Sequence, residues 1–423
     1  MRHPFRALPR KYRLWVLLVC GTALYFFANL QRVAVPGSIF NSLQGELDLS
    51  APQVTAFGSI FMYVYALDQL VIGLLVDRYG GFRVIAAGGL VFCVGSAAFA
   101  LSDSLMMLYC SRAVTALGAS CLYLSLVREI IRAFDRNLPV ILGLVVLTGY
   151  VGGIAANAPF VLSAEAIGWR HTLLVAAGIS SVFYLLFLAI KPTLKMPTPR
   201  RKPLSFRPFA ELLRKRHNRH LYMFYSVNFG LYYVMQTMIG KKFLEDFCRL
   251  PSTSSAWVLS GMGAISAAAG FGFAMLSRLL GNRRRVFARL AGGMCLGVFL
   301  AITGLVLGDV RSDWIVVLLC LLALTGSTVS VMVPLLRETN RPEVAGSSIS
   351  LMNSFAFMSV AIFGNAAGYL MDTARPKPQG DVLVYPDSSY LAVFTVFFLA
   401  SCEVAWCAFQ LRETWGKNES ETI

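Results

Sequence analysis

The sequence predicts an all-α membrane protein of twelve transmembrane helices in two pseudo-symmetric six-helix bundles. Composition is the first reason, because 57% of the 423 residues are hydrophobic and 14% are charged, unlike a soluble globular chain. The second is a series of apolar segments of about twenty residues, each long enough to span a bilayer. The third is a charged turn over residues 73–83 between two such segments. Hydrocarbon excludes charge, so this turn must lie at a membrane surface.

The apolar segments place the helices in order. The first is too long for the hydrophobic part of a cleavable signal peptide, so we expect it to be retained. The expected spans are 14–40, 53–76, 84–101, 105–128, 139–163, 171–190, 219–240, 253–276, 286–307, 313–336, 343–370 and 389–410.

Lys and Arg are distributed unequally between the two sides of these spans. They are about four times as frequent on the side of the amino terminus as on the opposite side, where Lys241 and Lys242 are assigned to an outer loop. This bias predicts that both termini are cytoplasmic. The longest polar connection is rich in proline and basic residues. We therefore expect a first bundle over 1–190, a cytoplasmic linker over 191–218, and a second bundle with a short cytoplasmic tail over 219–423.

Several function classes are disfavoured. The net charge of +16 comes from short basic clusters between apolar runs, which argues against a nucleic-acid partner. Most of the nine cysteines lie in apolar segments, and no Cys/His spacing typical of a metal site occurs. No phosphate-binding loop or nucleophile elbow is present, so we expect neither an enzyme nor a cofactor.

The charged turn carries Gly73, Asp77, Arg78, Gly80 and Arg83. In these residues and their spacing it resembles the loop motif between the second and third helices of the major facilitator superfamily. The resemblance covers essentially the whole chain. It implies the major facilitator fold, with this turn as a cytoplasmic gate that acts as a conformational latch.

A degenerate copy of the turn follows the eighth helix, at residues 273–285. Arg278 and Arg283 stand at the offsets of the two arginines of the first turn, and Ser277 replaces its aspartate. Weak internal repetition of this kind is typical of transporters built from duplicated bundles.

Two further segments resemble the family. Residues 112–119 look like the Arg-led motif of its fourth helix, with Thr115 and Ala116 in place of the usual Gln and Gly. In the fifth helix Gly149 stands where drug/proton antiporters have proline, which counts against that activity. The glycines of this helix either let helices approach closely or contribute to coupling.

Polar residues recur at helical spacing on one face of the first helix, and again in the seventh, its counterpart in the second half. A polar face cannot face lipid, so the two stripes indicate a central cavity. The stripes comprise Tyr25, Asn29, Arg32, Tyr225, Asn228, Tyr232 and Gln236.

Two arginines within the spans favour an anionic substrate. The segment around Arg32 resembles, in pattern, the organic-anion and organophosphate branches of the superfamily, whose first helix offers an arginine to the substrate. Its permanent charge requires an anion or a wet cavity. Arg112 either binds substrate as well, or caps carbonyls or joins an ion pair.

Three other polar residues within or at the ends of the spans are notable. Asp68 is either a proton carrier or the partner of an arginine near the cytoplasmic end. Glu129 is expected to form a surface ion pair with its neighbour Arg128. Asn353 in the eleventh helix is a further substrate-binding candidate.

These residues predict a secondary transporter that moves a small organic anion or zwitterion, with proton-coupled symport. A drug or metabolite exporter using proton antiport, and a non-transporting sensor of the same fold, are the alternatives. We expect a monomer in a bacterial inner membrane, with the substrate, protons and the lipid bilayer as its partners.

Overall fold

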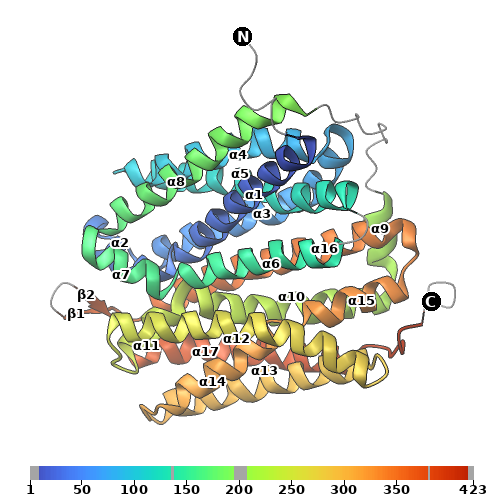
Figure 1. Cartoon of the computed structure of the whole chain (residues 1–423). Helices are drawn as coiled ribbons and strands as arrows, with labels where there is room; N and C mark the ends of the chain where they lie inside the picture. Colours follow the sequence, from blue (N-terminus) through green and yellow to red (C-terminus); the bar gives the residue numbers. More distant parts are fainter. Residues whose placement is uncertain (1–8, 135–137, 195–206, 380–381, 418–423) are drawn as a thin grey trace. The chain divides into compact units, whose positions relative to one another are not determined.

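The computed structural model describes residues 9–134, 138–194, 207–379 and 382–417, and these residues are almost entirely helical (Figure 1). The β-structure among them is one antiparallel hairpin of β1 (Lys377–Gln379) and β2 (Val382–Val384), with Pro378 opposite Leu383. The chain divides into two compact units. Unit 1 contains residues 1–34 and 67–204, and unit 2 contains residues 35–66 and 205–423.

Unit 1 holds most of the first six predicted spans. Its elements are α1 (Arg10–Ala34), the second part of α3 (Ala51–Tyr79), α4 (Gly81–Leu101), α5 (Leu105–Ala133), α6 (Leu138–Ala155), α7 (Ala158–Ile167), α8 (Trp169–Ile190) and the 3-10 turn η3 (Lys191–Thr193).

Unit 2 holds the remaining spans and the connection between the first two. Its elements are η2 (Gly37–Ile39), α2 (Phe40–Leu47), the first part of α3, α9 (Arg207–Arg214), α10 (Arg216–Val234), the π-helical turn η4 (Met235–Ile239), α11 (Gly240–Asp246), α12 (Ser252–Leu279), α13 (Arg284–Leu307), α14 (Trp314–Thr325), α15 (Val329–Thr339), α16 (Pro342–Met371), the hairpin and α17 (Asp387–Gln410).

Every predicted span corresponds to helix, although several are interrupted. In the described part of the chain, ten helical segments are long and apolar enough to cross a membrane, and the bent pair α6–α7 would be an eleventh. The remaining predicted span is the seventh, 219–240, which lies mainly in α10 and η4, where polar and aromatic side chains lower the hydropathy.

The interruptions have local causes. The first predicted span, 14–40, changes at Ala34, because the ring of Pro36 has no N–H to continue the α-helical ladder. The fifth bends by 45° between α6 and α7, where Pro159 occupies the first turn of α7. The tenth breaks between α14 and α15, directly after Thr325.

Small residues set the packing of unit 1. Figure 1 shows α1, α4, α5 and α8 side by side, and α1 and α4 each contact the other three helices. A Cβ added to Gly95 of α4 would lie 2.6 Å from the backbone nitrogen of Thr115 of α5, and one added to Gly118 would overlap the backbone at Phe92. These glycines let α4 and α5 approach closely, as is usual between membrane helices.

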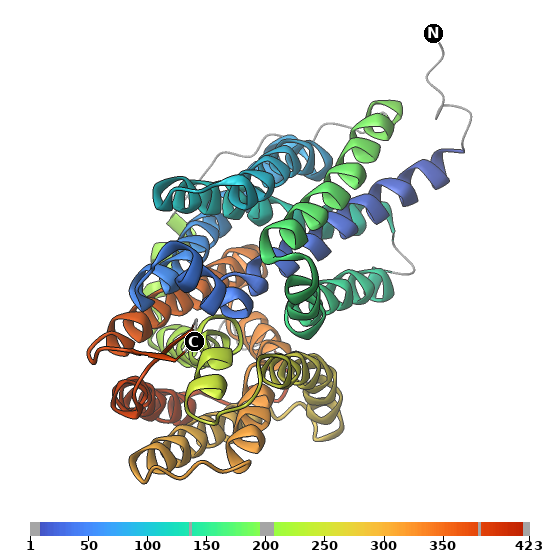
Figure 2. The ribbon, with the colours of Figure 1, turned by 90° about the vertical axis from the view of Figure 1, so that its left-hand side faces the viewer.

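Residues 35–66 belong by sequence to the first half of the chain but pack within unit 2. Met238 of η4 lies against Gly58 of α3 and Gly364 of α16, and a Cβ on Gly58 would be 2.7 Å from its methyl carbon. In Figure 2, α10 and α16 lie together, and the two helices are in contact within the same unit. The predicted bundle boundaries stay a prediction, and residues 195–206 of the predicted linker lie outside the described residues.

Candidate functional site

The polar face of α1 gathers three of the predicted substrate residues in unit 1. The side-chain amide of Asn29 donates to the Tyr25 carbonyl at 2.8 Å, and the Arg32 guanidinium donates to Asn29 Oδ1. The Tyr25 ring stacks on Tyr123 of α5, with centroids 5.2 Å apart. A Cβ on Gly149 of α6 would lie 2.5 Å from the Tyr25 ring. Close packing therefore explains this glycine of the fifth predicted helix.

Arg112 lies next to Arg32 but faces the backbone. Its side chain is 1% exposed, and it donates to the carbonyls of Gln31 and Arg32 at 3.0 and 3.4 Å. A cation at the last carbonyls of a helix stabilises the negative end of the helix dipole. This contact corresponds to the carbonyl-capping alternative for Arg112, and substrate binding by it stays a prediction.

Asp68 is half-buried in α3 and contacts α5. Ser120 Oγ donates to its carboxylate at 3.0 Å. Among the residues that the structure describes, no Lys or Arg lies within ion-pair distance of this carboxylate. Asp68 therefore has a neutral hydrogen-bond donor as its neighbour, and its proposed role as a proton carrier stays a prediction.

The predicted gate turn lies between α3 and α4. Gly80 has φ +86°, a conformation that glycine adopts without strain, and this residue reverses the chain into α4. Asp77 pairs with Arg128 of α5 at 3.4 Å, and both side chains are about half exposed. Arg78 lies over the Tyr79 ring at 5.4 Å. A Cβ on Gly73 would meet no heavy atom within 4 Å, so no close contact requires glycine there.

Glu129 corrects one expectation from the sequence. It is 2% exposed and does not pair at the surface with Arg128, because its carboxylate accepts from the Gly81 nitrogen at 2.7 Å. A carboxylate at the first N–H groups of a helix satisfies a donor that has no partner within the helix. Glu129 thus fixes the start of α4.

The degenerate second turn, between α12 and α13, has different contacts. Arg284 donates to Ser277 Oγ at 2.8 Å and pairs with Glu338 of α15 at 3.1 Å. The Glu413 carboxylate accepts from the backbone nitrogens of Arg284 and Arg285 at 2.7 and 3.0 Å. The predicted gate residue Arg278 is exposed on the last turn of α12.

A buried histidine lies in the same unit as this turn. His217 begins α10, before the predicted span, and is 7% exposed. Neither ring nitrogen has a hydrogen-bond partner among the described residues. Burial, followed by the positive charge of Arg412, lowers the pKa of His217 to about 4. The imidazole is therefore neutral at physiological pH.

The polar stripe of the seventh predicted helix supports a helix break in unit 2. Asn228 donates to the Thr325 carbonyl at 2.7 Å, at the end of α14. A Cβ on Gly326 would lie 2.4 Å from the Tyr232 ring. Both side chains therefore hold the gap between α14 and α15.

The last two predicted substrate residues also lie in unit 2. Gln236 is 6% exposed within η4, a π-helical turn of the kind that often marks functional sites. Asn353 is half-buried on α16, and the described residues provide no hydrogen-bond partner for its side chain. The predicted role of these residues in a common substrate site stays a prediction.

The family follows from a match to a known domain. The family model described as Major Facilitator Superfamily matches residues 17–365. The chain belongs to the major facilitator superfamily. It is an integral, multi-pass membrane protein of a transporter family, as the sequence predicted, and not a member of an enzyme family.

Three curated relatives of this major facilitator chain are transporters by name. The riboflavin transporter RibZ of Clostridioides difficile is 27% identical over 43% of this chain and 40% of its own length. The probable sulfoacetate transporter SauU of Cupriavidus necator is 24% identical over 39% of this chain and 38% of its own. The MFS-type transporter pynF of Aspergillus niger is 24% identical over 43% and 42%. Each match spans about two fifths of the relative.

Solved structures show the same fold over nearly the full chain. The peptide transporter POT in complex with sulfate superimposes with a TM-score of 0.74 at 15% identity, covering 94% of each chain. A bacterial homologue of the lysosomal transporter Spinster gives 0.70 at 15% identity, covering 96% and 98%. The nucleoside transporter NupG (D323A) gives 0.67 at 15% identity, covering 93% and 99%.

The structure reveals a buried polar cluster that the sequence analysis assigned to an outer loop. Lys242 is fully buried in α11, pairs with Asp246 at 2.9 Å, and donates to the Leu383 carbonyl of β2. Asp246 also accepts from Tyr390 at 2.8 Å. Tyr385 accepts from Gln44 of α2 at 2.8 Å, and burial raises its pKa to about 12.

Lys241 is also helical and buried rather than in a loop. It pairs with Glu245 at 2.6 Å, which in turn accepts from Asn41 of α2 at 2.8 Å. The loop assignment of both lysines is therefore wrong. A signal for them was present, because each lysine lies four residues before an acid, the spacing of an ion pair on a helix.

A repeated dipeptide marks the other residues that the sequence analysis missed. Arg128–Glu129 lies near the end of α5, and Arg337–Glu338 lies near the end of α15 in the second half. Glu129 contacts the start of α4, and Glu338 contacts the start of α13. Comparing the two halves at the ends of these helices, in addition to the turns, would have found both acids.

Proposed function

We propose that this chain is a secondary active transporter that moves a small organic anion or zwitterionic metabolite by alternating access, as a proton-coupled symporter. The observation that carries the proposal is the half-buried Arg32, which Asn29 holds on the polar face of α1. A guanidinium cannot lose its charge, and carboxylates, sulfonates and phosphates match its geometry. The similarity to SauU, which is named for sulfoacetate, supports an anionic substrate.

Asp68 supports the proton-coupling part of the proposal. Its carboxylate lies within a predicted span and is neighboured by the Ser120 hydroxyl rather than by a cation. A carboxylate without a cationic partner can accept a proton at moderate cost, since protonation removes the penalty of burying its charge.

Two contact sets are proposed as the latches of alternating access. On the predicted cytoplasmic side, the half-exposed Asp77–Arg128 pair is weak enough to open and re-form. On the predicted outer side, residues 35–66 are held in unit 2 by contacts of α2, including Gln44 to Tyr385. We expect transport to require the release of each latch in turn.

Uptake by the purified protein in proteoliposomes tests the proposal. Small carboxylates, sulfonates and phosphate esters are supplied with and without an inward proton gradient, and we expect saturable uptake of one class that the gradient accelerates. Arg32→Ala should abolish it, whereas Arg32→Lys should retain part of it with a raised KM. Full-affinity uptake by Arg32→Ala would refute the anion site. The thermal midpoint of each variant controls for folding.

Asp68→Asn separates coupling from binding. We expect gradient-driven uptake to be lost, while counterflow exchange of substrate continues. Uptake that still responds to the gradient in this variant would return Asp68 to a structural role.

An exporter remains the second candidate because unit 2 contains an aromatic cluster. Phe229 stacks on Tyr225 and Tyr233 with centroids 5.8 and 5.0 Å apart, and lies edge-on to Phe357 at 5.6 Å. Such rings suit a planar aromatic compound, and RibZ is named as a riboflavin transporter. Proton-driven extrusion of planar compounds from inside-out vesicles would favour this function. The absence of both transport and counterflow would favour the non-transporting sensor.

A further inference from the structure

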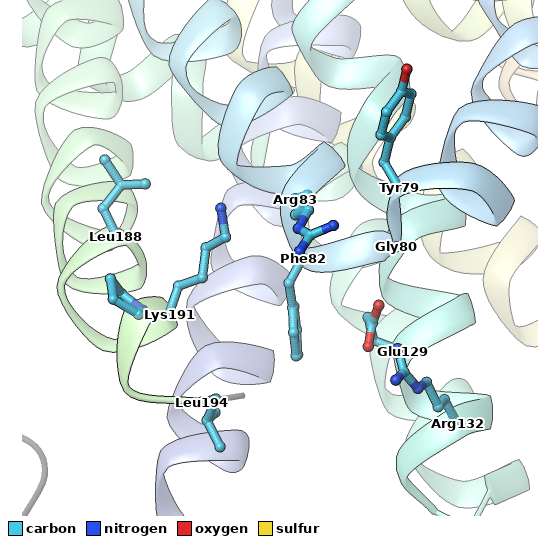
Figure 3. Close-up of a pocket in the computed structure, with 10 residues that line it drawn as sticks. Tyr79, Gly80, Phe82, Arg83, Glu129, Arg132, Leu188, Lys191 and Leu194 are labelled. Carbon is cyan, nitrogen blue, oxygen red and sulfur yellow. The ribbon is translucent and has the colours of Figure 1, made fainter. Parts of the chain in front are cut away.

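Unit 1 contains a cavity of about 390 Å³ beside the first turn of α4 (Figure 3). Figure 3 shows that its walls come from three places: the start of α4, the end of α5, and the end of α8 with η3. The side chains that matter for its chemistry are Phe82, Arg83, Glu129, Arg132, Leu188 and Lys191. A liquid water occupies about 30 Å³, so the cavity could hold a group much larger than a single water.

The cavity has an excess of positive charge. It is lined by Arg83, Arg132 and Lys191 against the single carboxylate of Glu129. Among the described residues, neither Arg83 nor Lys191 has an acid within ion-pair distance, and their own charges repel each other. Arg83 and Lys191 thus face the same cavity, and no described acidic side chain lies between them.

The Glu129 carboxylate already accepts a hydrogen bond from the backbone. Its Oε1 accepts from the Gly81 nitrogen at 2.7 Å, and its side chain is 2% exposed. The exposed Arg83 and Arg132 and the half-buried Lys191 are therefore the accessible charges of the cavity. An anion that enters would be attracted by these cations, and this attraction would offset the repulsion between Arg83 and Lys191.

The position of the cavity suits a lipid. It lies where α4 begins and α8 ends, at helix ends that the distribution of Lys and Arg predicts to be cytoplasmic. Leu188 and Leu194 add apolar surface to its wall, and Tyr79, which is 46% exposed, adds an aromatic ring. Basic pockets at the ends of membrane helices are suited to anionic headgroups, and aromatic residues are common at that depth.

We propose that this cavity binds the phosphate of an anionic phospholipid headgroup, with Arg83, Lys191 and Arg132 as its ligands. The same phosphate chemistry could come from a soluble phosphate ester, so the experiment must separate the two sources. The site is distinct from the residues around Arg32, and it does not depend on the proposed transport function.

The test measures lipid binding to the purified full-length chain. Phosphatidylglycerol, phosphatidylcholine and soluble glycerol phosphate are each titrated into detergent-solubilised protein, and the bound molecules are counted by native mass spectrometry. We expect phosphatidylglycerol to bind more tightly than phosphatidylcholine. Each of Arg83→Gln and Lys191→Gln should weaken it about fivefold, as expected for the loss of one cation near a lipid phosphate.

Arg283→Gln is the matched control. Arg283 is the repeat counterpart of Arg83, is also exposed, and lies over the Trp415 ring at 5.0 Å, outside this cavity. The Arg283→Gln variant loses the same charge, but at a place outside the cavity. Its affinity for phosphatidylglycerol should therefore not change. Arg83→Lys should restore most of the binding, which separates a loss of charge from misfolding.

Two results would overturn the lipid site. The first is unchanged phosphatidylglycerol affinity in the Arg83→Gln, Lys191→Gln double variant. The second is equal binding of phosphatidylcholine. Binding of glycerol phosphate that competes with lipid and disappears in the double variant would instead assign the cavity to a soluble phosphate ester, and would overturn the assignment to a lipid.

Discussion

The turn between α3 and α4 and its counterpart between α12 and α13 place their charges in opposite ways. In the first turn the acid, Asp77, lies in the last turn of α3, and its cation, Arg128, lies on α5. In the second turn the cation, Arg284, lies at the start of α13, and its acid, Glu338, lies on α15. Ser277 occupies the position of the missing aspartate and accepts a hydrogen bond from this arginine.

The two pairs also differ in burial. The side chains of the first pair are 46% and 47% exposed, whereas those of the second are 10% and 14% exposed. Exposed ion pairs contribute little to stability, while breaking a buried pair leaves an uncompensated charge and is costly. The comparison teaches that burial favours a fixed joint at the second turn, whereas the exposure of the first pair suits the proposed exchange of partners.

The largest expected effect is the loss of the buried pair. Arg284→Met leaves the Glu338 charge without its partner, and we expect destabilisation of about 4 kcal/mol, measured as a lower unfolding midpoint in detergent. The double variant Arg284→Met, Glu338→Leu should recover much of the loss, because neither charge remains. If Arg284→Met unfolded at the wild-type midpoint, the second turn would be no more fixed than the first.

The next largest effect is expected from acid, through the buried His217 of α10. The pKa of His217 falls from 6.5 when unfolded to about 4 when folded, so the unfolded chain binds the extra proton between these values. The stabilisation from the neutral imidazole is complete above pH 6.5 and is lost as the pH falls toward 4, by about 3 kcal/mol in all. The unfolding midpoint measured across this window should fall accordingly.

His217→Gln provides the control for this pH dependence. It keeps a polar side chain that does not titrate, so the slope of stability between pH 6.5 and 4 should flatten. An unchanged slope in the variant would show that other groups cause the loss. In that case the acid sensitivity would not arise from His217 or from the region of Arg412 and Glu413.

A smaller effect is expected from the helix start in the first half. Glu129→Ala removes the acceptor of the buried Gly81 N–H, and we expect a loss of about 2 kcal/mol in unfolding stability. Glu129→Gln keeps an oxygen acceptor and should lose less. Equal losses in the two variants would argue that charge, rather than the hydrogen bond, holds α4.

The smallest change in stability belongs to the gate pair. Asp77→Asn should alter the unfolding free energy by less than about 1 kcal/mol, because the pair is half exposed. It should nevertheless slow transport severalfold if this pair is a latch. Ser277→Asp is the reciprocal variant, since it adds an acid to the second turn near Arg284. Normal uptake by Asp77→Asn would make the first turn a marker of topology alone.

Much of the fold could be predicted because its determinants are local. The apolar segments gave helices at every expected span, and the residues that interrupt them, such as Pro36 and Pro159, act through their own backbone. The partners of charged residues were harder to predict. Glu129 was assigned to Arg128, next to it in sequence, but contacts Gly81, which is 48 residues away.

The candidate site shows the same division. The polar stripe on α1 could be predicted because residues three and four apart share a helix face. The contact of Arg112 with the carbonyls of Gln31 and Arg32 could not, because it depends on where α5 packs against α1. The repeated Arg–Glu dipeptide was visible, but its meaning required the helix starts that it contacts.

The sequence by itself determined which segments enter the membrane, where its charged turns lie, and which helix faces are polar. These properties follow from hydrophobicity and helical periodicity, which adjacent residues specify. Only the tertiary structure decided that Lys242 is fully buried beside Asp246 and β2, and that Asp77 and Arg284 have such different exposure. Burial and pairing depend on helices distant in sequence, and the energy of a charge depends on the solvent those helices exclude.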